Sequence, residues 1–276
     1  MQKWQCRVAP SLGELEGEHH EVWGTLKYRS IYLPTVFMGL YSLRDFIELW
    51  NHKGQKAILW CGSDIIHFKN GYWLDEKGNI RLDYKALAKW ISETCYSYVE
   101  NVVEHEELRK LGINSTIVPS FMGEVNRYKL LYEHSERPKL YASVSGDNFK
   151  MYGWDRIDSL ALNNPDIEFH LYGNTKPWRS PHKNVFVHGR MAKDSMNDQI
   201  RNMQGGLRLL EHDGFSEILA KSVLWGQWPV SAIPYPHMLS IEEIGTIKDK
   251  KEPNVEGRNY YMRELNRFPW NATFNE

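Results

Sequence analysis

The strongest constraint in this sequence is an alternation of short apolar segments with amphipathic segments that runs through most of the chain. Residues 35–42, TVFMGLYS, and residues 56–62, KAILWCG, are apolar runs typical of buried strands. Between them, apolar residues recur at helical spacing over residues 43–50, and Gly54 stands where a helix C-cap is expected. Because strand–helix–strand repetition produces a parallel sheet covered by helices, the expected fold class is α/β.

The same alternation continues on both sides of a polar, basic segment at residues 123–139, which we interpret as a linker. Before it, the pattern predicts helices over 83–95 and 101–112 and strands over 96–100 and 115–121. After it, the pattern predicts strands over 140–145, 167–173, 184–189, 205–210 and 229–233, and helices over 155–165, 195–203, 216–225 and 259–267.

This organisation predicts two Rossmann-like, doubly wound domains facing a cleft. The first spans residues 1–124 and the second residues 138–250, with a C-terminal helix at 258–276 packing back on the first. The first domain is expected to be reduced, since only about ninety residues separate Thr35 from the linker. In open sheets of this kind ligands bind outside the carboxyl ends of the strands, so the ligand-binding residues are expected just after strands.

The amino-acid composition limits which binding partners and which cellular compartment are expected. The chain is 42% hydrophobic and 25% charged with a net charge of −1, which indicates a globular protein and gives no reason to expect nucleic acid as a partner. No apolar run approaches the roughly 18 residues of a membrane span, although weak membrane association stays open. The three widely spaced cysteines and an N-terminus without a secretory pattern favour the cytoplasm.

The segment HDGFSE, residues 212–217, follows a predicted strand and precedes a predicted helix. Gly214 would allow a ligand to approach the backbone closely, and the Asp213 carboxylate could accept hydrogen bonds from sugar hydroxyls. Ser216 can serve as the N-cap of the helix, whose free N–H groups and dipole favour a phosphate. The alternative interpretation is that Asp213 and Ser216 only cap the helix.

Other post-strand loops carry further candidates. Gly146 permits a tight turn, and Lys150 in the same loop could neutralise phosphate or simply be a solvated charge. The backbone at Gly173–Asn174 and at Gly189–Met191, a segment that includes Arg190, could border a nucleotide base.

In the first domain, Asp64 follows the strand at 56–59. Its carboxylate could orient a hydroxyl or accept a proton there. An Asx-turn or a helix cap is the equally favoured alternative for this residue.

The segment from Pro165 to Ile233 resembles the donor domain of GT-B glycosyltransferases of the family 4-like group. That group has a V-x-F-x-G strand followed by a segment such as E-G-F-G…E-A…G-x-P-V-V. Here VFVHG, then DGFS, then Gly226 with PVSA occupy the corresponding places. The resemblance extends in outline from Thr35 to Ile233.

The resemblance implies transfer of a sugar, of the hexosyltransferase type, from a nucleotide-sugar donor to a hydroxyl of a glycan, lipid or small-molecule acceptor. It implies the GT-B fold, no bound metal, no cofactor and retention of configuration. Lys150 and the helix start at Ser216–Glu217 would hold the diphosphate. Asp213, Gly214 and Phe215 would shape the sugar pocket, and Asp64 would lie on the acceptor side.

One departure from the family pattern affects the donor site. The family has two glutamates separated by seven residues, whereas here Asp213 fills the first place and Lys221 the second. The second normally meets the donor ribose, and Glu217 lies one helical turn earlier. This departure leaves two alternatives open: a nucleotide-sugar binding protein with little turnover, and a nucleotide-sugar epimerase of the same fold.

Overall fold

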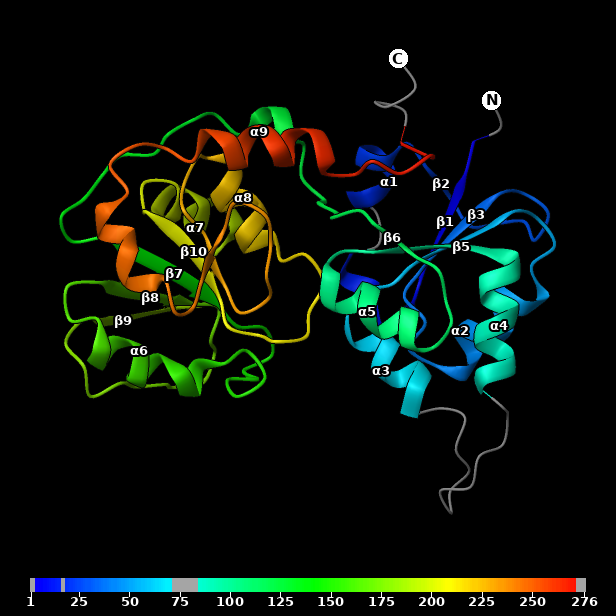
Figure 1. Ribbon diagram of the computed structural model, residues 1–276, viewed down its shortest axis with the longest axis horizontal. Helices are drawn as coiled ribbons and strands as arrows, with labels where there is room; N and C mark the ends of the chain where they lie inside the picture. Colours follow the sequence, from blue (N-terminus) through cyan, green and yellow to red (C-terminus); the bar gives the residue numbers. More distant parts are fainter. Residues whose placement is uncertain (1–2, 16–17, 71–83, 272–276) are drawn as a thin grey trace. The chain divides into compact units, whose positions relative to one another are not determined.

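The computed structural model describes residues 3–15, 18–70 and 84–271, and the chain forms two compact units (Figure 1). The first unit comprises Met1–Gly123, His212–Phe215 and Glu264–Glu276, and the second comprises Glu124–Glu211 and Ser216–Arg263. The residues 212–215 therefore belong to the first unit by their contacts, although they follow a strand of the second.

The first unit is built on a six-stranded sheet in the order β2-β1-β3-β4-β5-β6, with all neighbouring strands parallel. Two of these strands, β1 and β2, come from N-terminal residues that the periodicity left unassigned. The first unit consequently has few residues but still forms a six-stranded sheet. The strands are β1 (Gln5–Val8), β2 (Leu26–Lys27), β3 (Thr35–Met38), β4 (Lys56–Leu59), β5 (Cys95–Val99) and β6 (Thr116–Ile117).

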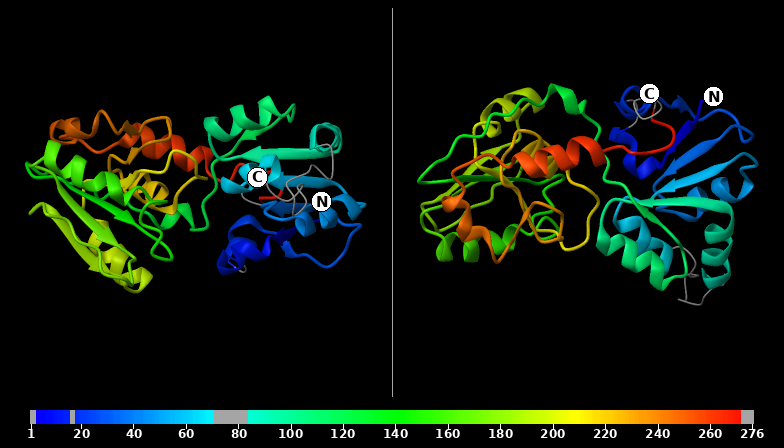
Figure 2. Two further views of the ribbon diagram at one scale, coloured as in Figure 1. Left: turned by 90° about the horizontal axis from the view of Figure 1, so that it is seen from below. Right: turned by 45° about the horizontal axis from the view of Figure 1, so that its top comes forward.

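Helices cover both faces of this sheet (Figure 2). Alternate residues of β3 and β4 enter different apolar clusters: Phe37 and Ile58 pack in one, and Val36 and Leu59 in the other. Because successive side chains of a strand point to opposite faces, this separation shows that the sheet is buried on both sides. The helices are α1 (Glu18–Trp23), α2 (Leu43–Asn51), α3 (Ser63–Asn70), α4 (Tyr84–Thr94) and α5 (Val102–Lys110), with the 3-10 segment η1 (Pro10–Leu15).

Helix α2 begins with a capping box between Ser42 and Asp45, but it does not end at Gly54 as the sequence suggested. Its C-cap is His52, whose backbone is extended and whose ring nitrogen Nε2 lies 2.9 Å from the Leu33 carbonyl. The N–H of Gly54 instead donates to the carbonyl of Ile31. The tertiary contacts of His52 therefore end the helix before the glycine is reached.

The second unit has a parallel six-stranded sheet in the order β12-β11-β10-β7-β8-β9. All five strands predicted after the linker are present, with β12 as an addition. The strands are β7 (Lys139–Ser143), β8 (Glu168–Tyr172), β9 (Val185–Gly189), β10 (Gly205–Arg208), β11 (Val230–Ser231) and β12 (Leu239–Ser240).

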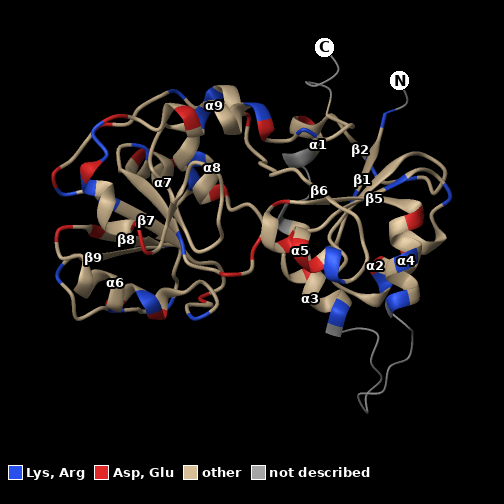
Figure 3. Cartoon of the chain, in the orientation of Figure 1, with Lys and Arg blue, Asp and Glu red and all other residues tan. Residues whose placement is uncertain are grey.

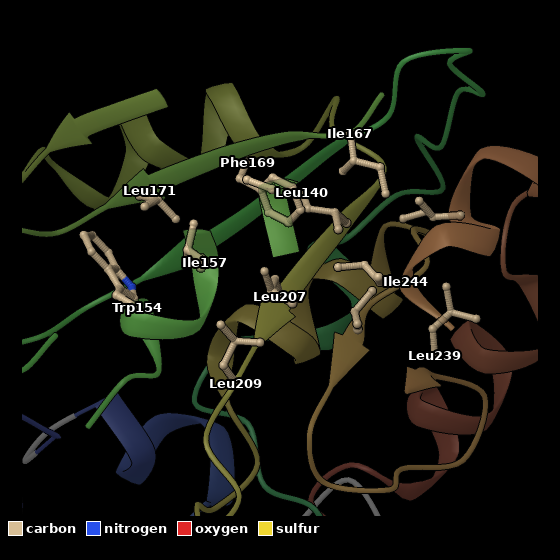
Figure 4. Close-up of a cluster of buried hydrophobic side chains, with 14 of the residues drawn as sticks. Leu140, Trp154, Ile157, Ile167, Phe169, Leu171, Leu207, Leu209, Leu239 and Ile244 are labelled. Atoms are coloured by element: carbon tan, nitrogen blue, oxygen red, sulfur yellow. The ribbon is translucent and has the colours of Figure 1, made fainter. Parts of the chain in front are cut away.

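The helices of the second unit lie on both faces of its sheet (Figure 2). On one face, Ile157 of α6 packs with Phe169 and Leu207 in the main apolar cluster (Figure 4). On the other, Ile200 of α7 and Ile218 of α8 pack against tyrosines of β7 and β8. The helices are α6 (Ile157–Asn163), α7 (Lys193–Ile200), α8 (Glu217–Leu224) and α9 (Val255–Glu264), with 3-10 segments η2 (Val125–Arg127), η3 (Trp154–Arg156) and η4 (Ile244–Asp249).

Helix α9 was expected over 259–267, but it begins four residues earlier. The side chain of Asn254 accepts a hydrogen bond from the N–H of Gly257 at 3.0 Å, which gives the helix a cap that the apolar periodicity did not indicate. Beyond α9, Phe268 and Trp270 enter an apolar cluster of the first unit. None of the helices described is long and apolar enough to cross a membrane.

Candidate donor-binding site

The loop His212–Phe215 is held by the residues that follow β5. The side-chain amide of Asn101 donates a hydrogen bond to the carbonyl of Asp213 at 2.7 Å. The N–H of Phe215 donates to Oε2 of Glu100 at 2.9 Å. Two consecutive side chains of the first unit thus fix the backbone of the loop on both sides of Gly214.

Gly214 has a steric reason to be glycine. A Cβ at this position would lie 2.0 Å from Oε2 of Glu100, closer than any real contact allows. Gly62, after β4, has a φ of +83°, and a Cβ there would lie 3.0 Å from the backbone nitrogen of Gly214. In this structure, the groups that approach the backbone of Gly214 closely are therefore the side chain of Glu100 and the loop after β4.

Glu100 and Glu104 are functional candidates that the sequence analysis missed. Burial raises the pKa of Glu100 to about 7, although hydrogen bonds from Ser120 and Phe215 oppose the rise. The pKa of Glu104 is also raised, first by burial and then by the neighbouring charge of Glu100. The available signal was an acid at the strand end, directly before the helix-capping Asn101.

Glu104 lies in the first turn of α5 and Glu100 directly precedes its N-cap Asn101, and acidic residues gather around this helix (Figure 3). One oxygen of Glu104 accepts a hydrogen bond from the N–H of Glu100 at 2.7 Å, and its other oxygen is buried with no hydrogen-bond partner among the described residues. On the same helix, Glu107 pairs with Nε2 of His212 at 2.9 Å. The loop His212–Phe215 thus meets carboxylates of the first unit at its beginning and at its end.

Asp64 is fully buried in the first turn of α3. Its two oxygens accept hydrogen bonds from the backbone N–H groups of Leu40 and Cys61, each at 3.0 Å. Burial raises the pKa of Asp64 to about 7 despite these bonds. The carboxylate therefore joins the loops after β3 and β4.

In the second unit, the loops after β7, β8 and β9 are tied together. The carboxylate of Asp147, next to Gly146, accepts a hydrogen bond from the N–H of Thr175 at 2.7 Å. The N–H of Gly173 donates to the carbonyl of Gly189 at 2.9 Å. The proposed base-binding segments are consequently neighbours at the carboxyl edge of one sheet.

The side chains of these loops differ in exposure. Lys150 and Arg190 are exposed, and Met191 packs at the edge of an apolar cluster. Asn174 is nearly buried, with its side-chain nitrogen donating to the Lys176 carbonyl; in the part of the chain that the structure describes, its oxygen has no hydrogen-bond partner. The exposed cations are therefore available to solvent-borne anions.

The start of α8 combines an uncapped helix end with an ion pair between the buried Lys221 and the half-exposed Glu217. Ser216 occupies the N-cap position, but its side chain makes no capping hydrogen bond. The buried Nζ of Lys221 lies 3.0 Å from Oε1 of Glu217 and 3.0 Å from Oδ1 of Asn197. Burial acts to raise the pKa of Glu217, but Lys221 and Lys193 outweigh it, and the pKa is lowered. Lys221 thus links α8 to α7 through its contact with Asn197.

The candidate residues are divided between the two units. Asp64 and Asp213–Phe215 lie in the first unit, and the remaining candidates lie in the second. Among the residues that the structure describes, no group of three or more histidines, cysteines or acids is arranged to hold a metal ion.

No protein-family model and no curated protein sequence matches the chain. Solved structures do match. The chain superposes on TarM with a TM-score of 0.56 at 11% identity, covering 84% of this chain and 52% of TarM. Its fold is that of the GT-B glycosyltransferases. The chain spans about half the length of TarM, so this likeness concerns the GT-B fold and not the whole of that protein.

Two further structures share the GT-B fold with this chain. Sucrose-phosphate synthase from Thermosynechococcus elongatus gives a TM-score of 0.55 at 11% identity, covering 83% of this chain and 69% of that one. Anabaena HepE in complex with UDP-glucose gives a TM-score of 0.53 at 8% identity, covering 87% of this chain and 77% of that one.

Proposed function

We propose that this protein is a glycosyltransferase that moves a sugar from a nucleotide-sugar donor to an acceptor hydroxyl. The observation that carries the proposal is the GT-B fold, shared with a protein solved in complex with UDP-glucose. The family-like segment DGFS supports it, because it follows β10 at the edge where open sheets bind ligands. The finer expectations of a hexosyltransferase, retention of configuration, a cytoplasmic location and independence of metals and cofactors are part of the proposal.

The donor diphosphate is assigned to the second unit. Lys150 supplies a positive charge, and the N-terminus of α8 at Ser216–Glu217 offers N–H groups that no Ser216 side chain occupies. Preorganised donors of this kind stabilise the charge that develops on a leaving diphosphate. The backbone at Gly173–Asn174 and Gly189–Met191 is assigned to the base.

The sugar is assigned to Asp213, Gly214 and Phe215. Asp64 is assigned to the acceptor side, where its carboxylate also holds the loops after β3 and β4 through the N–H groups of Leu40 and Cys61. A glycan, a lipid or a small molecule remains open as the acceptor. Phosphate and sugar recognition need no nucleic-acid or cofactor contribution in this scheme.

A second candidate function is a nucleotide-sugar binding protein with little turnover. The observation that favours it is Lys221, which is buried in an ion pair where the family has its second glutamate. Slow hydrolysis of a nucleotide-sugar by the purified protein would favour the transferase over this candidate.

The experiment that tests the proposal is a calorimetric titration with UDP-glucose, UDP and the other nucleoside diphosphates. Binding of at least one diphosphate is expected, since the assigned diphosphate contacts do not depend on the sugar. The absence of binding for every nucleotide and nucleotide-sugar in the panel would contradict the donor site itself.

Substitution Lys150→Ala is expected to weaken diphosphate binding about tenfold or more, because hydrogen bonds to charged groups contribute about 1.5–3 kcal/mol. Calorimetry on the variant measures the change. Lys183→Ala removes an exposed lysine before β9 and serves as the matched control. Equal affinities for wild type and Lys150→Ala would remove the role assigned to Lys150.

A further inference from the structure

We propose that Glu100 is a positioning residue that fixes the backbone of Gly214 and Phe215 for recognition of the donor sugar. The inference rests on the proposed function, and it adds to it a residue that lies outside the family-like motif. Glu100 comes from the end of β5, more than a hundred residues before the loop that it holds.

The Glu100 carboxylate joins two loops of the first unit. Its Oε2 accepts the N–H of Phe215 at 2.9 Å. Its Oε1 accepts the N–H of Ser120 at 3.2 Å and also the hydroxyl of Ser120. A planar carboxylate with donors on both oxygens has one favoured orientation, so the position of Phe215 is linked to that of the loop after β6.

Glu100 is itself held rigidly. Its own N–H donates to Glu104, whose N–H in turn donates to the side chain of Asn101 at 3.0 Å. The side chain of Asn101 then reaches the carbonyl of Asp213. The start of α5 therefore forms a buried frame of hydrogen bonds that reaches the loop at two points.

The sequence accommodates this contact with glycine. Any side chain at Gly214 would occupy the space that Oε2 of Glu100 fills, since a Cβ would lie 2.0 Å away. Within the described residues Glu100 has no ion-pair partner, and only 6% of its surface is exposed. A buried carboxylate without a cation is costly, and its hydrogen bonds to the loop offset part of that cost.

The proposal separates recognition of the sugar from recognition of the nucleotide. If Glu100 shapes the sugar-binding loop, replacing it weakens the binding of a nucleotide that carries the donor sugar more than the binding of the nucleotide alone. UDP lacks the donor sugar, and its base and diphosphate are assigned to residues of the second unit. The ratio of the affinities for UDP-glucose and UDP is therefore a readout that general destabilisation does not change.

The test compares wild type with Glu100→Gln, which keeps the size of the side chain but lacks the second acceptor oxygen. Calorimetry is expected to show UDP-glucose binding about tenfold weaker in Glu100→Gln and UDP binding within twofold of wild type. Glu106→Gln, an exposed acid on α5 paired with Arg109, is the matched control. An unchanged ratio of the two affinities overturns the positioning role.

Hydrogen exchange of the Phe215 amide gives a second readout that needs no ligand. We expect exchange at least tenfold faster in Glu100→Gln, and unchanged exchange would also overturn the proposal. If wild type binds neither UDP nor UDP-glucose while Phe215 exchange responds to Glu100→Gln, the contact is confirmed, but the proposed function and the sugar role fail.

A further variant keeps the test informative if Glu100→Gln does not fold. Gly214→Ala displaces the carboxylate from the opposite side and is expected to reduce the same affinity ratio and to speed Phe215 exchange. Where both single variants fold, the double variant is expected to lose little more than either alone, because both act on one contact. Fully additive losses would show that they act independently and would overturn the proposal.

Discussion

Replacing Lys221 by glutamate is expected to lower the free energy of unfolding by about 3–5 kcal/mol and to weaken nucleotide-sugar binding, although it restores the family pattern. Lys221 is 6% exposed, and its ammonium contacts Glu217 and Asn197. A glutamate in its place would bury a carboxylate one turn from the half-exposed carboxylate of Glu217. Of the cations that the structure describes beside Glu217, the half-exposed Lys193 would remain.

Urea unfolding of the variant and calorimetry with UDP-glucose measure the two effects. Lys221→Met is the informative partner, because it removes the charge but keeps an unbranched apolar side chain. Its expected loss is smaller, since it leaves Asn197 and Glu217 without their buried cation but adds no repulsion. Lys251→Glu introduces the same charge change at an exposed position and is the control.

Tighter UDP-glucose binding by Lys221→Glu would contradict this interpretation. It would mean that the position contacts the donor ribose and that the local ion pair adapts. The expected result instead assigns Lys221 to the packing of α8 on α7. Ribose recognition would then involve other groups of the second unit, with Glu217 held in place by the two lysines.

The order of strands and helices could be predicted because both sheets are parallel and buried on both faces. Such strands are predominantly apolar, and Lys56–Leu59 and Glu168–Tyr172 are recognisable without any knowledge of their neighbours. Strands β1, β2 and β12 were not assigned. Two of these have only two residues, and β1 (Gln5–Val8) contains a glutamine and an arginine that are buried by tertiary contacts.

The position of the candidate loop was also predictable, because ligands bind where parallel strands end. Its partners were not. Glu100 and Phe215 are 115 residues apart, and a single sequence carries no signal that one contacts the other. A charged residue is normally assigned to the surface, so the burial of Glu100, Glu104 and Lys221 was not expected.

Asp64→Asn is expected to change how stability depends on pH. The pKa of Asp64 is raised from 3.8 to about 7 by burial, so the folded state binds its proton more tightly than the unfolded state. The stability from this group is fully present below about pH 4 and is lost as the pH rises to about 7. At 1.36 kcal/mol per pKa unit, the loss is roughly 4 kcal/mol.

Other groups of the first unit contribute to the wild-type profile. Glu100, with a pKa of about 7, and Glu104, with a raised pKa, act in the same direction as Asp64. His52 has a lowered pKa, from burial first, so its contribution is lost as the pH falls and opposes theirs. Subtracting the Asp64→Asn profile from the wild-type profile removes these shared contributions.

The measurement is urea unfolding of wild type and Asp64→Asn at intervals between pH 4.5 and 7.5, followed by tryptophan fluorescence. The free energy of unfolding of wild type, relative to that of Asp64→Asn, is expected to fall by several kcal/mol as the pH rises across this range. The reason is that only the aspartate must ionise in a buried site. Glu93→Gln, which alters an exposed carboxylate of α4, is expected to leave the profile parallel to wild type. Parallel profiles for wild type and Asp64→Asn would show that Asp64 stays ionised throughout the range, held by the N–H groups of Leu40 and Cys61.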